Sequence, residues 1–338
     1  MKISTAITVL FSELWKPRMP VCPTLGKNRG ARFQCWGKLL ACLALVSLAL
    51  LPVLHAAEAP KSAAGGKGRQ FSAQEVFDYR QPLIFQDAFQ AALFGKWNFS
   101  EDDRYRLPKE TPERIQIVDA PGLGAGEKAV RFTVRRGPNS FRSEISLPHE
   151  PGFHERWYGE RIYVPGDWVF DPSRAVDIVM QWHAIPGNWK ATFPNLEISI
   201  GNTNWFIRQS YGAAQTKPMR VNERLAEPVQ RGAWVAWVIH AKWSPGADGV
   251  LQIWRDGKLV LDRKGPNVYS SISVDYTPYL KTGIYHPEWH LDKAGKREAF
   301  DKENPVATNK VIYATDIKIG DERASHESVC PGTTRSLK

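Results

Sequence analysis

The chain is poor in cysteine, and most of its cysteines lie near the N-terminus. Of four cysteines in 338 residues, Cys22, Cys35 and Cys42 precede residue 57 and only Cys330 follows it. A mature chain beginning near residue 58 therefore cannot form an internal disulfide. Its fold must depend on a hydrophobic core, for which a chain of this length has ample material.

Recognisable metal-binding patterns are also missing. His149, Glu150 and His154 are close in sequence, but their spacing matches no zinc pattern and is typical of a surface loop. No compact Asp-rich loop predicts a calcium site. The sequence therefore predicts no metal site and no required cofactor.

The excess of basic residues is smaller in the mature chain than the total indicates. The whole sequence has a formal net charge of +10, but residues 1–56 hold seven basic residues and one acidic residue. These residues account for +6 and leave +4 for the remainder. Because so small an excess is weak evidence for a polyanion partner, the positions of individual cations must carry that argument.

An apolar run near the N-terminus predicts export. Leu39–Leu54 has about the length of a signal-peptide core, follows basic residues and is followed by His55-Ala56-Ala57, whose small residues suit cleavage. A membrane anchor is the alternative, but the run is short for a span and contains Pro52. We expect residues 1–57 to be a leader and the mature chain to be periplasmic or secreted, without a stable membrane anchor.

The mature chain is dominated by alternation of apolar and polar residues. Eleven segments bounded by Gly, Pro, Asn or Asp are typical of strands: Lys128–Arg136, Arg142–Leu147, Trp157–Val164, Asp177–Ala184, Asn195–Ile200, Trp205–Tyr211, Ala233–Trp243, Val250–Arg255, Lys258–Asp262, Tyr279–Tyr285 and Lys310–Ile319. Because no run of helices intervenes, the pattern predicts an all-β fold, a jelly roll or concanavalin-like sandwich of two antiparallel sheets.

Shorter signals complete the predicted organisation. Asp256-Gly257 between two strands predicts a two-residue hairpin turn, and Ser72 with Glu75 predicts a capped short helix. We expect a linker and short helix over 58–79, one β domain over 80–325 and a polar tail over 326–338. The thirteen tryptophans can stack on sugars, although most are expected to fill the sandwich.

Polar side chains that can perform chemistry occur on three of the predicted strands. Strand alternation places Lys281, Gly283 and Tyr285 on one face, and the glycine is expected to leave open space between the cation and the phenol. Gln181 and His183 share one face of their strand, together with Asp177 and Val179.

The third strand adds a cation and a carboxylate. Arg142 and Glu144 share one face, which by itself is typical of a surface ion pair of little energetic value. Together the three strands supply a guanidinium, an amide, an imidazole, an ammonium and a phenol. This set suits β-elimination on a uronic acid: donors neutralise the carboxylate, a base removes the C5 proton and an acid protonates the leaving oxygen at C4.

Three motifs resemble the signature strands of the β-jelly-roll alginate lyases: Arg142-Ser143-Glu144-Ile145, Gln181-Trp182-His183 and Tyr279-Leu280-Lys281-Thr282-Gly283-Ile284-Tyr285. The wider context is similar to the heparin lyase I-like polysaccharide lyases, which share that fold. Four segments carry this second likeness: Arg156-Trp157-Tyr158-Gly159, Tyr163-Val164-Pro165-Gly166-Asp167-Trp168, Gly232-Ala233-Trp234 and Trp254-Arg255-Asp256-Gly257.

The resemblance implies a role for each matching residue. His183 would be the base and Tyr285 the acid, with Tyr285 serving both roles for one uronate epimer, so the identity of the base stays open. Arg142 and Gln181 would neutralise the carboxylate, and Lys281 would bind the acidic chain. Further candidates for substrate binding are Glu144, Arg135 and Lys190. Heparin lyases of this type can carry a structural calcium ion, which this sequence does not itself predict.

One departure from the alginate lyase pattern follows Tyr285. Those enzymes usually continue with Asn-Gln, whereas this chain continues with His286-Pro287, and we expect the choice of substrate to depend on this difference. The modest positive charge also makes an unsulfated polyuronate at least as suitable as sulfated heparin. Which polyuronate is cleaved, and whether cleavage is endo or exo, stays open; we expect a monomer.

Two other functions remain as alternatives. A glycoside hydrolase on the same fold needs two carboxylic acids, commonly as Glu-x-Asp-x-x-Glu, and that pattern is absent because Glu197 stands alone on its strand. A non-catalytic carbohydrate-binding module would keep tryptophans and cations without needing His183 and Tyr285 together. Export and the modest charge argue against nucleic-acid binding.

Overall fold

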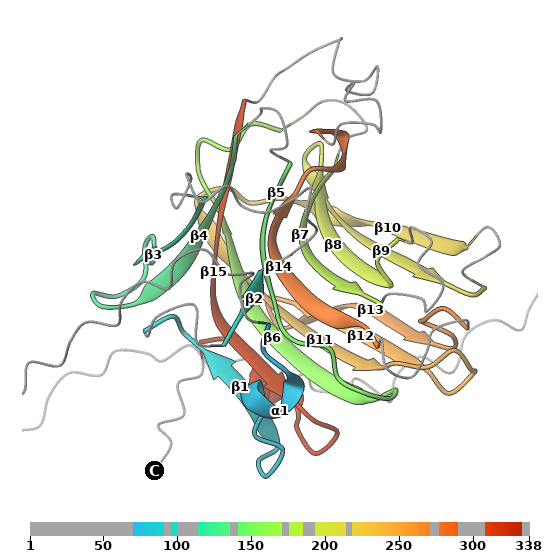
Figure 1. Ribbon diagram of the computed structural model, residues 1–338. Helices are drawn as coiled ribbons and strands as arrows, with labels where there is room; N and C mark the ends of the chain where they lie inside the picture. The colour runs from blue at the N-terminus through green and yellow to red at the C-terminus, as the bar shows by residue number, and fades with distance from the viewer. Residues whose placement is uncertain are drawn as a thin grey trace, which may run out of the picture. The chain divides into compact units, whose positions relative to one another are not determined.

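Two antiparallel β-sheets make up most of the described part of the computed structural model (Figure 1), as the sequence predicts. The structure describes residues 70–90, 96–99, 114–135, 141–170, 176–184, 193–213, 218–270, 277–289 and 308–332. The predicted leader, including Leu39–Leu54, lies outside these residues. None of the helices within the described ranges is long and apolar enough to cross a membrane.

The larger sheet has eight strands in the order β13-β12-β11-β6-β15-β4-β3, with β1 also paired to β15. Their bounds are β1 Leu83–Asp87, β3 Ile115–Asp119, β4 Lys128–Arg135, β6 Glu155–Val164, β11 Ala233–Lys242, β12 Val250–Arg255, β13 Lys258–Lys264 and β15 Asn309–Gly320. The turn between β12 and β13 is the predicted two-residue hairpin, in which Asp256 and Gly257 both have positive φ (50° and 77°).

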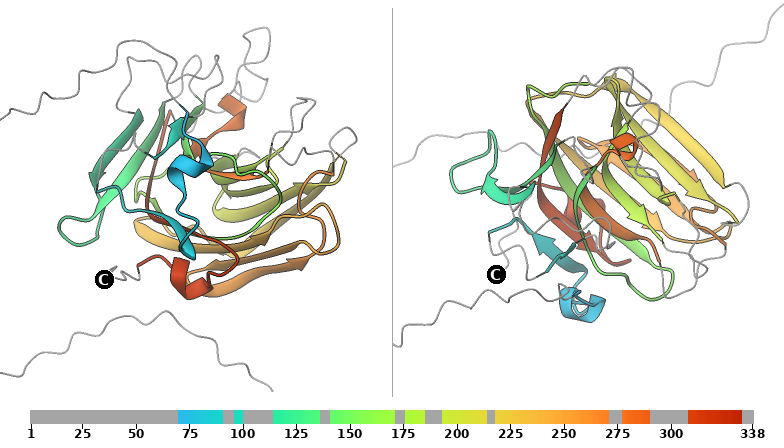
Figure 2. Two further views of the ribbon diagram at one scale, coloured as in Figure 1. Left: turned by 60° about the horizontal axis from the view of Figure 1, so that its bottom comes forward. Right: turned by 45° about the horizontal axis from the view of Figure 1, so that its top comes forward.

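The smaller sheet has seven strands in the order β10-β9-β8-β7-β14-β5-β2. Their bounds are β2 Asn98–Phe99, β5 Arg142–Ser146, β7 Val176–His183, β8 Leu196–Gly201, β9 Asn204–Tyr211, β10 Met219–Pro228 and β14 Tyr279–Tyr285. Figure 2 shows the two sheets as facing layers.

All eleven predicted strands form, and four strands were missed. The missed strands are β1, β2, β3 and β10. Strand β10 is mostly exposed along its length and lies at the edge of its sheet, so no buried apolar face marks it in the sequence. Strand β2 is only two residues long, too short to show alternation.

Apolar side chains from both sheets fill the space between the layers. Among the most completely buried are Trp182, Trp205, Trp237 and Trp243, each at most 1% exposed. Trp205 and Trp237 meet edge to face with ring centroids 5.2 Å apart. These tryptophans therefore act as core residues and are not available to stack on sugars.

Both ends of the described chain pack onto this sandwich. The predicted short helix is α1, Ala73–Val76, closed by a capping box of Ser72 and Glu75. At the other end, residues 326–332 are not the polar tail that was expected. His326–Val329 forms helix α2, Val329 is fully buried, and Lys318 donates a hydrogen bond to the Cys330 carbonyl.

Strand β7 is interrupted by a bulge that changes which face Asp177 occupies. The register with β8 shifts between Ile178 and Met180, so Asp177 pairs with Ile200, a core residue. The sequence prediction that Asp177 shares a face with Gln181 is therefore wrong. A bulge adds one residue to a strand and reverses the alternation beyond it.

A carboxyl group is buried between the two sheets. Glu160 on β6 is 2% exposed and accepts a hydrogen bond from the Thr282 hydroxyl on β14. Burial raises the pKa of Glu160 from its ordinary value of 4.5 to about 8, although the Thr282 bond opposes this shift. Glu160 is thus neutral in the fold near pH 7.

This raised pKa predicts that stability falls as pH rises. The contribution of neutral Glu160 is complete below about pH 4.5 and is lost as pH rises through about 8. The loss is on the order of a few kcal/mol, since each pKa unit corresponds to about 1.4 kcal/mol. Urea denaturation at pH 5 and pH 9 should show the variant Glu160→Gln losing much less stability than the native chain. If the native chain and Glu160→Gln lost equal stability between pH 5 and pH 9, the raised pKa of Glu160 would be contradicted.

Candidate active site

The three motif strands lie side by side, with β14 between β7 and β5 (Figure 1). Residues paired across an antiparallel ladder share a face, so the register defines successive rows. Tyr279 pairs with His183, and Lys281 pairs with Gln181 and Ser146. The remaining rows pair Gly283 with Glu144 and Tyr285 with Arg142. The side of the sheet that carries these rows is called the polar face below.

Glu144 is the residue that joins Arg142 to Gln181. Its Oε2 lies 3.0 Å from Arg142 Nε, and its Oε1 accepts a hydrogen bond from Gln181 Nε2. The Glu144 side chain is only 2% exposed. The expectation of a weakly paired surface ion pair is therefore wrong: the pair belongs to the buried floor of the polar face, where charge-assisted bonds are stronger.

The Arg142 guanidinium also covers the ring of Tyr285. Arg142 Cζ lies 4.2 Å from the Tyr285 ring centroid. Burial opposes the charge of Arg142, but the nearby carboxylate of Glu144 and a hydrogen bond with Tyr285 outweigh it and raise the pKa of the guanidinium. Arg142 is thus a fixed cation beside a phenol.

Tyr279 is a site residue that the sequence analysis did not propose. It shares a row with His183, and Lys281 Nζ lies 5.1 Å from its ring centroid. The imidazole ring of His149 also lies close to Tyr279, at 3.8 Å centroid to centroid. Its position two residues before Lys281 on the same strand was a usable signal, because alternate residues share a face.

His149 is held neutral at this position. Burial lowers its pKa to about 4, a backbone hydrogen bond at Thr277 opposes the shift, and the positive charge of Lys281 adds to it. The backbone near it is also fixed, because Leu147 N donates to Leu280 O over 3.0 Å. His149 therefore belongs to the rim of the polar face, and the expectation of an exposed surface loop does not hold for it.

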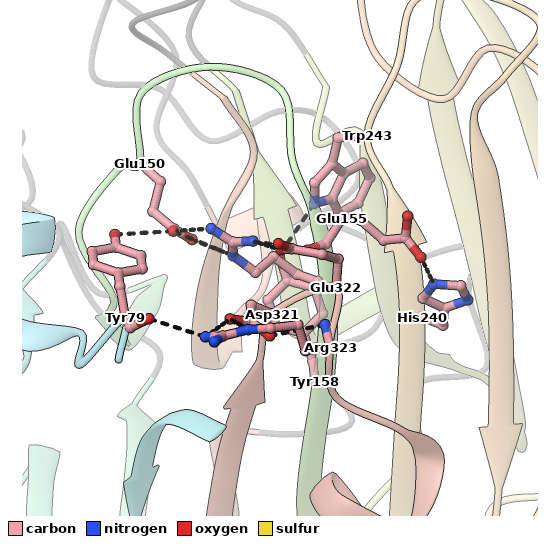
Figure 3. A network of polar contacts seen from close by, with 10 residues as sticks. Tyr79, Glu150, Glu155, Tyr158, His240, Trp243, Asp321, Glu322 and Arg323 are labelled. Carbon is pink, nitrogen blue, oxygen red and sulfur yellow. Dashed lines mark hydrogen bonds and ion pairs between the residues drawn. The ribbon is translucent and has the colours of Figure 1, made fainter. Parts of the chain in front are cut away.

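A network of buried polar contacts anchors the segment that follows His149 (Figure 3). Glu150 accepts hydrogen bonds from Arg156 Nη2 over 2.6 Å and from the Tyr79 hydroxyl over 3.1 Å. Its backbone carbonyl accepts a bond from the Thr277 hydroxyl. Through these bonds Glu150 anchors separate segments to one another. Among the described residues no group of His, Cys, Asp and Glu is arranged to hold a metal ion.

Gly283 is required by the backbone of the neighbouring strand. Its φ is +137°, and a Cβ atom there would lie 2.1 Å from Ser143 O and 2.7 Å from Glu144 Cα. The expected role of this glycine, to leave open space for substrate, is different from the one observed. Close approach of β5 and β14 is the physical reason for glycine here.

His286, where the chain departs from the alginate lyase pattern, points away from the polar face. It is 1% exposed, and its Nδ1 lies 2.8 Å from Asp177 Oδ1 in the core. Lys310 Nζ lies 3.0 Å from the other oxygen of Asp177. The expectation that the substrate choice depends on His286 has no support in this geometry, because the residue is part of a buried ionic cluster.

Two further cations were expected to bind substrate. Arg135 is the last residue of β4 and pairs with Asn309 in the eight-stranded sheet, so the structure does not place it on the polar face. Lys190 lies outside the described residues.

Comparison with known proteins identifies the family of the chain. The family model described as polysaccharide lyase matches residues 93–314. The chain belongs to this family. It is a polysaccharide lyase, and the glycoside hydrolase alternative is set aside. Among curated proteins no match was found.

Solved structures similar to the lyase include an endo-β-1,4-glucuronan lyase from the fungus Trichoderma reesei. It has a TM-score of 0.55 and 21% sequence identity, over 75% of this chain and 100% of that chain. Alginate lyase A1-II' of polysaccharide lyase family 7 has a TM-score of 0.38 and 15% identity over 57% and 79%. A PL-14 alginate lyase from Aplysia kurodai has a TM-score of 0.41 and 7% identity over 62% and 87%. Only the first likeness is close enough to bear on the fold.

Proposed function

We propose that this lyase cleaves a uronic-acid-containing polysaccharide by β-elimination at the polar face, leaving an unsaturated uronate at the new non-reducing end. The observation that carries the proposal is the gathering of Arg142, Gln181 and Lys281 beside His183 and Tyr285 on adjacent strands. Two cations and an amide suit a carboxylate, and an imidazole with a phenol suits proton transfer.

In the proposed reaction the uronate carboxylate lies against Arg142 and Gln181. Arg142 pairs with Glu144 through Nε, and its guanidinium presents a fixed positive charge to a substrate carboxylate. These donors stabilise the negative charge that develops as the C5 proton leaves. His183 and Tyr285 transfer the protons, one as base at C5 and the other as acid at the O4 leaving group.

The bulge in the β7–β14 ladder bears on how these two groups approach one sugar. The register shifts between Thr282 and Tyr285, and a bulged strand bends. His183 and Tyr285 occupy different rows, and we propose that a bend of β14 at this shift brings both to one sugar ring. Lys281, in the row between Tyr279 and Gly283, binds the acidic chain.

Glu144 is proposed to orient the carboxylate donors and not to bind substrate itself. A carboxylate can only accept hydrogen bonds, so it keeps Gln181 Nε2 turned toward it and the guanidinium in one orientation. Glu144→Gln should raise KM about tenfold through loss of charge-assisted bonds, with correct folding checked by circular dichroism. An unchanged KM in the folded variant would contradict this role.

The substrate proposed first is an unsulfated polyuronate such as glucuronan, the substrate named for the structural neighbour from Trichoderma reesei. A heparin lyase I-like specificity is the second candidate, on the sequence likeness. We also propose that the mature chain is exported and acts as a monomer. Size-exclusion chromatography with light scattering tests the second of these, and export is tested by finding the mature chain outside the cytoplasm.

The deciding experiment incubates the mature chain with glucuronan, alginate, hyaluronan and heparin and follows the ultraviolet absorbance of the unsaturated product. A rise in absorbance with one polymer supports the proposal. Binding to a polymer with no rise in absorbance would favour a non-catalytic module. New reducing ends without absorbance would indicate hydrolysis instead of elimination.

A further inference from the structure

Strands β9 and β10 extend the polar face away from the proposed cleavage site, and a stacked pair of side chains lies there. Arg220 on β10 places its guanidinium carbon 3.8 Å from the ring centroid of Phe193. Phe193 is 46% exposed, one of few large apolar residues so exposed among the described ranges. The guanidinium thus lies over an aromatic ring that is still accessible to solvent.

Arg220 is connected to the site through hydrogen bonds across the sheet. Asn195 Oδ1 accepts a bond from Ala184 N, next to His183, over 3.1 Å. Asn195 Nδ2 donates to Ser210 O over 3.1 Å, and Ser210 pairs directly with Arg220. Arg220 therefore lies three strands from β7, roughly 14 Å at the usual strand spacing.

A buried tyrosine holds the backbone of Phe193. The Tyr269 hydroxyl donates to the Phe193 carbonyl over 2.8 Å, and Tyr269 is 1% exposed. Stacking on an aromatic face restricts the guanidinium to one plane, so less conformational entropy is lost when it binds a ligand. The pair is thus preorganised for a planar anion.

Arg220 also differs from its neighbour Arg208 in what it contacts. Arg208 Nη1 lies 3.2 Å from the buried Glu197, and Arg208 Nε lies 3.3 Å from Asn222 Oδ1. Among the described residues no carboxylate lies within ion-pair distance of Arg220, and its charge acts on Glu197 at longer range. Its guanidinium can therefore offer two parallel N–H groups to a carboxylate.

We propose that Arg220 and Phe193 form a distal subsite that binds the carboxylate of a uronate a few sugars from the bond that is cleaved. This inference rests on the proposed function and adds to it a requirement for substrate length. Arg220 grips the carboxylate in two-pronged fashion, and Phe193 keeps the guanidinium in place. A short oligosaccharide bound at His183 would not reach this subsite.

The test compares Arg220→Ala with the native lyase on a polyuronate and on the trisaccharide of the same polymer. KM for the polymer should rise about tenfold, because a charge-assisted hydrogen bond is lost, while kcat stays unchanged. KM for the trisaccharide should not change. The rise should shrink at high salt, since exposed charges are screened.

Arg231→Ala is the matched control. Arg231 also stacks on a phenylalanine, with Cζ 5.4 Å from the Phe170 ring centroid, but it lies in the turn that leads to β11 in the other sheet. Its loss should leave KM for both substrates unchanged. Arg220→Lys, which keeps the charge but not the planar fork, should fall between the native lyase and Arg220→Ala.

The inference and the proposed function fail in different ways. If the native lyase releases no unsaturated product from any polymer, the proposed function fails. Affinity electrophoresis in gels containing glucuronan or alginate then still tests the subsite. Arg220→Ala should be retarded less than the native chain, and equal retardation would overturn the subsite. If the native lyase is active and Arg220→Ala has the native KM for the polymer, or an equal rise for polymer and trisaccharide, the distal subsite is overturned.

Discussion

His183→Ala is expected to lower kcat for a polyuronate by about 10²- to 10⁴-fold, the usual contribution of a positioned proton-transfer group. His183 shares a row with Tyr279 and lies two residues from Gln181 on β7, so its loss removes the imidazole from the centre of the proposed site. The change is read as the rate of ultraviolet absorbance increase. Tyr285→Phe should cause a loss of the same order, since it removes the phenol but leaves the ring beneath Arg142.

Binding of the polymer by His183→Ala distinguishes a loss of catalysis from a loss of folding. His183→Ala should still be retarded in a gel containing the polymer, because Arg142 and Lys281 are untouched. His240→Ala is a matched control, since His240 lies on β11 of the other sheet and bonds Glu155 and Gln252. If His183→Ala and Tyr285→Phe both kept native kcat, the elimination centre would have to lie elsewhere.

The second large effect is expected on stability, from Asp177→Ala. Asp177 accepts bonds from His286 and Lys310, and all three residues are at most 3% exposed. Burial opposes its charge, but the His286 bond and the positive charge of Lys310 outweigh it and hold the pKa of Asp177 below its ordinary value. Removing Asp177 leaves the Lys310 ammonium buried without its counter-ion, at a cost of about 3–5 kcal/mol.

This cluster also connects the two sheets. Asp177 and His286 belong to β7 and to the segment after β14, and Lys310 belongs to β15. Thermal unfolding should show a Tm lower by roughly 10 °C for a domain of this size. The double variant Asp177→Leu with Lys310→Met should recover much of that loss, because it removes both charges together. If Asp177→Ala had the native Tm, the cluster would contribute little to the stability of the fold.

Much of the fold follows from local sequence pattern. Alternation of apolar and polar residues predicted eleven strands, and turn residues such as Asp256-Gly257 predicted a hairpin that forms with positive φ at both positions. These signals are local, because the side chains of a strand alternate between core and solvent. The edge strand β10 was missed for the converse reason, since it buries little.

The candidate site was predicted in composition but not in arrangement. Arg142, Gln181, His183, Lys281 and Tyr285 lie on three adjacent strands, as motif and alternation indicated. Which side chains meet depends on register between strands distant in sequence, and no local pattern carries that information. His149 was missed because its contact with Tyr279 is set by the β5–β14 pairing and by the anchor at Glu150, whereas strand alternation from Lys281 was enough to find Tyr279.

Local pattern and motifs establish the class of the protein: an all-β chain with three polar strand motifs suited to a uronate. Contacts between distant strands, in contrast, make Glu144 a buried bridge between Arg142 and Gln181 and turn Asp177 toward the core with His286. The physical reason is the same in both cases. A bulge or a cross-strand pairing decides whether a polar side chain is solvated or buried, and buried polar groups must find partners from elsewhere in the chain.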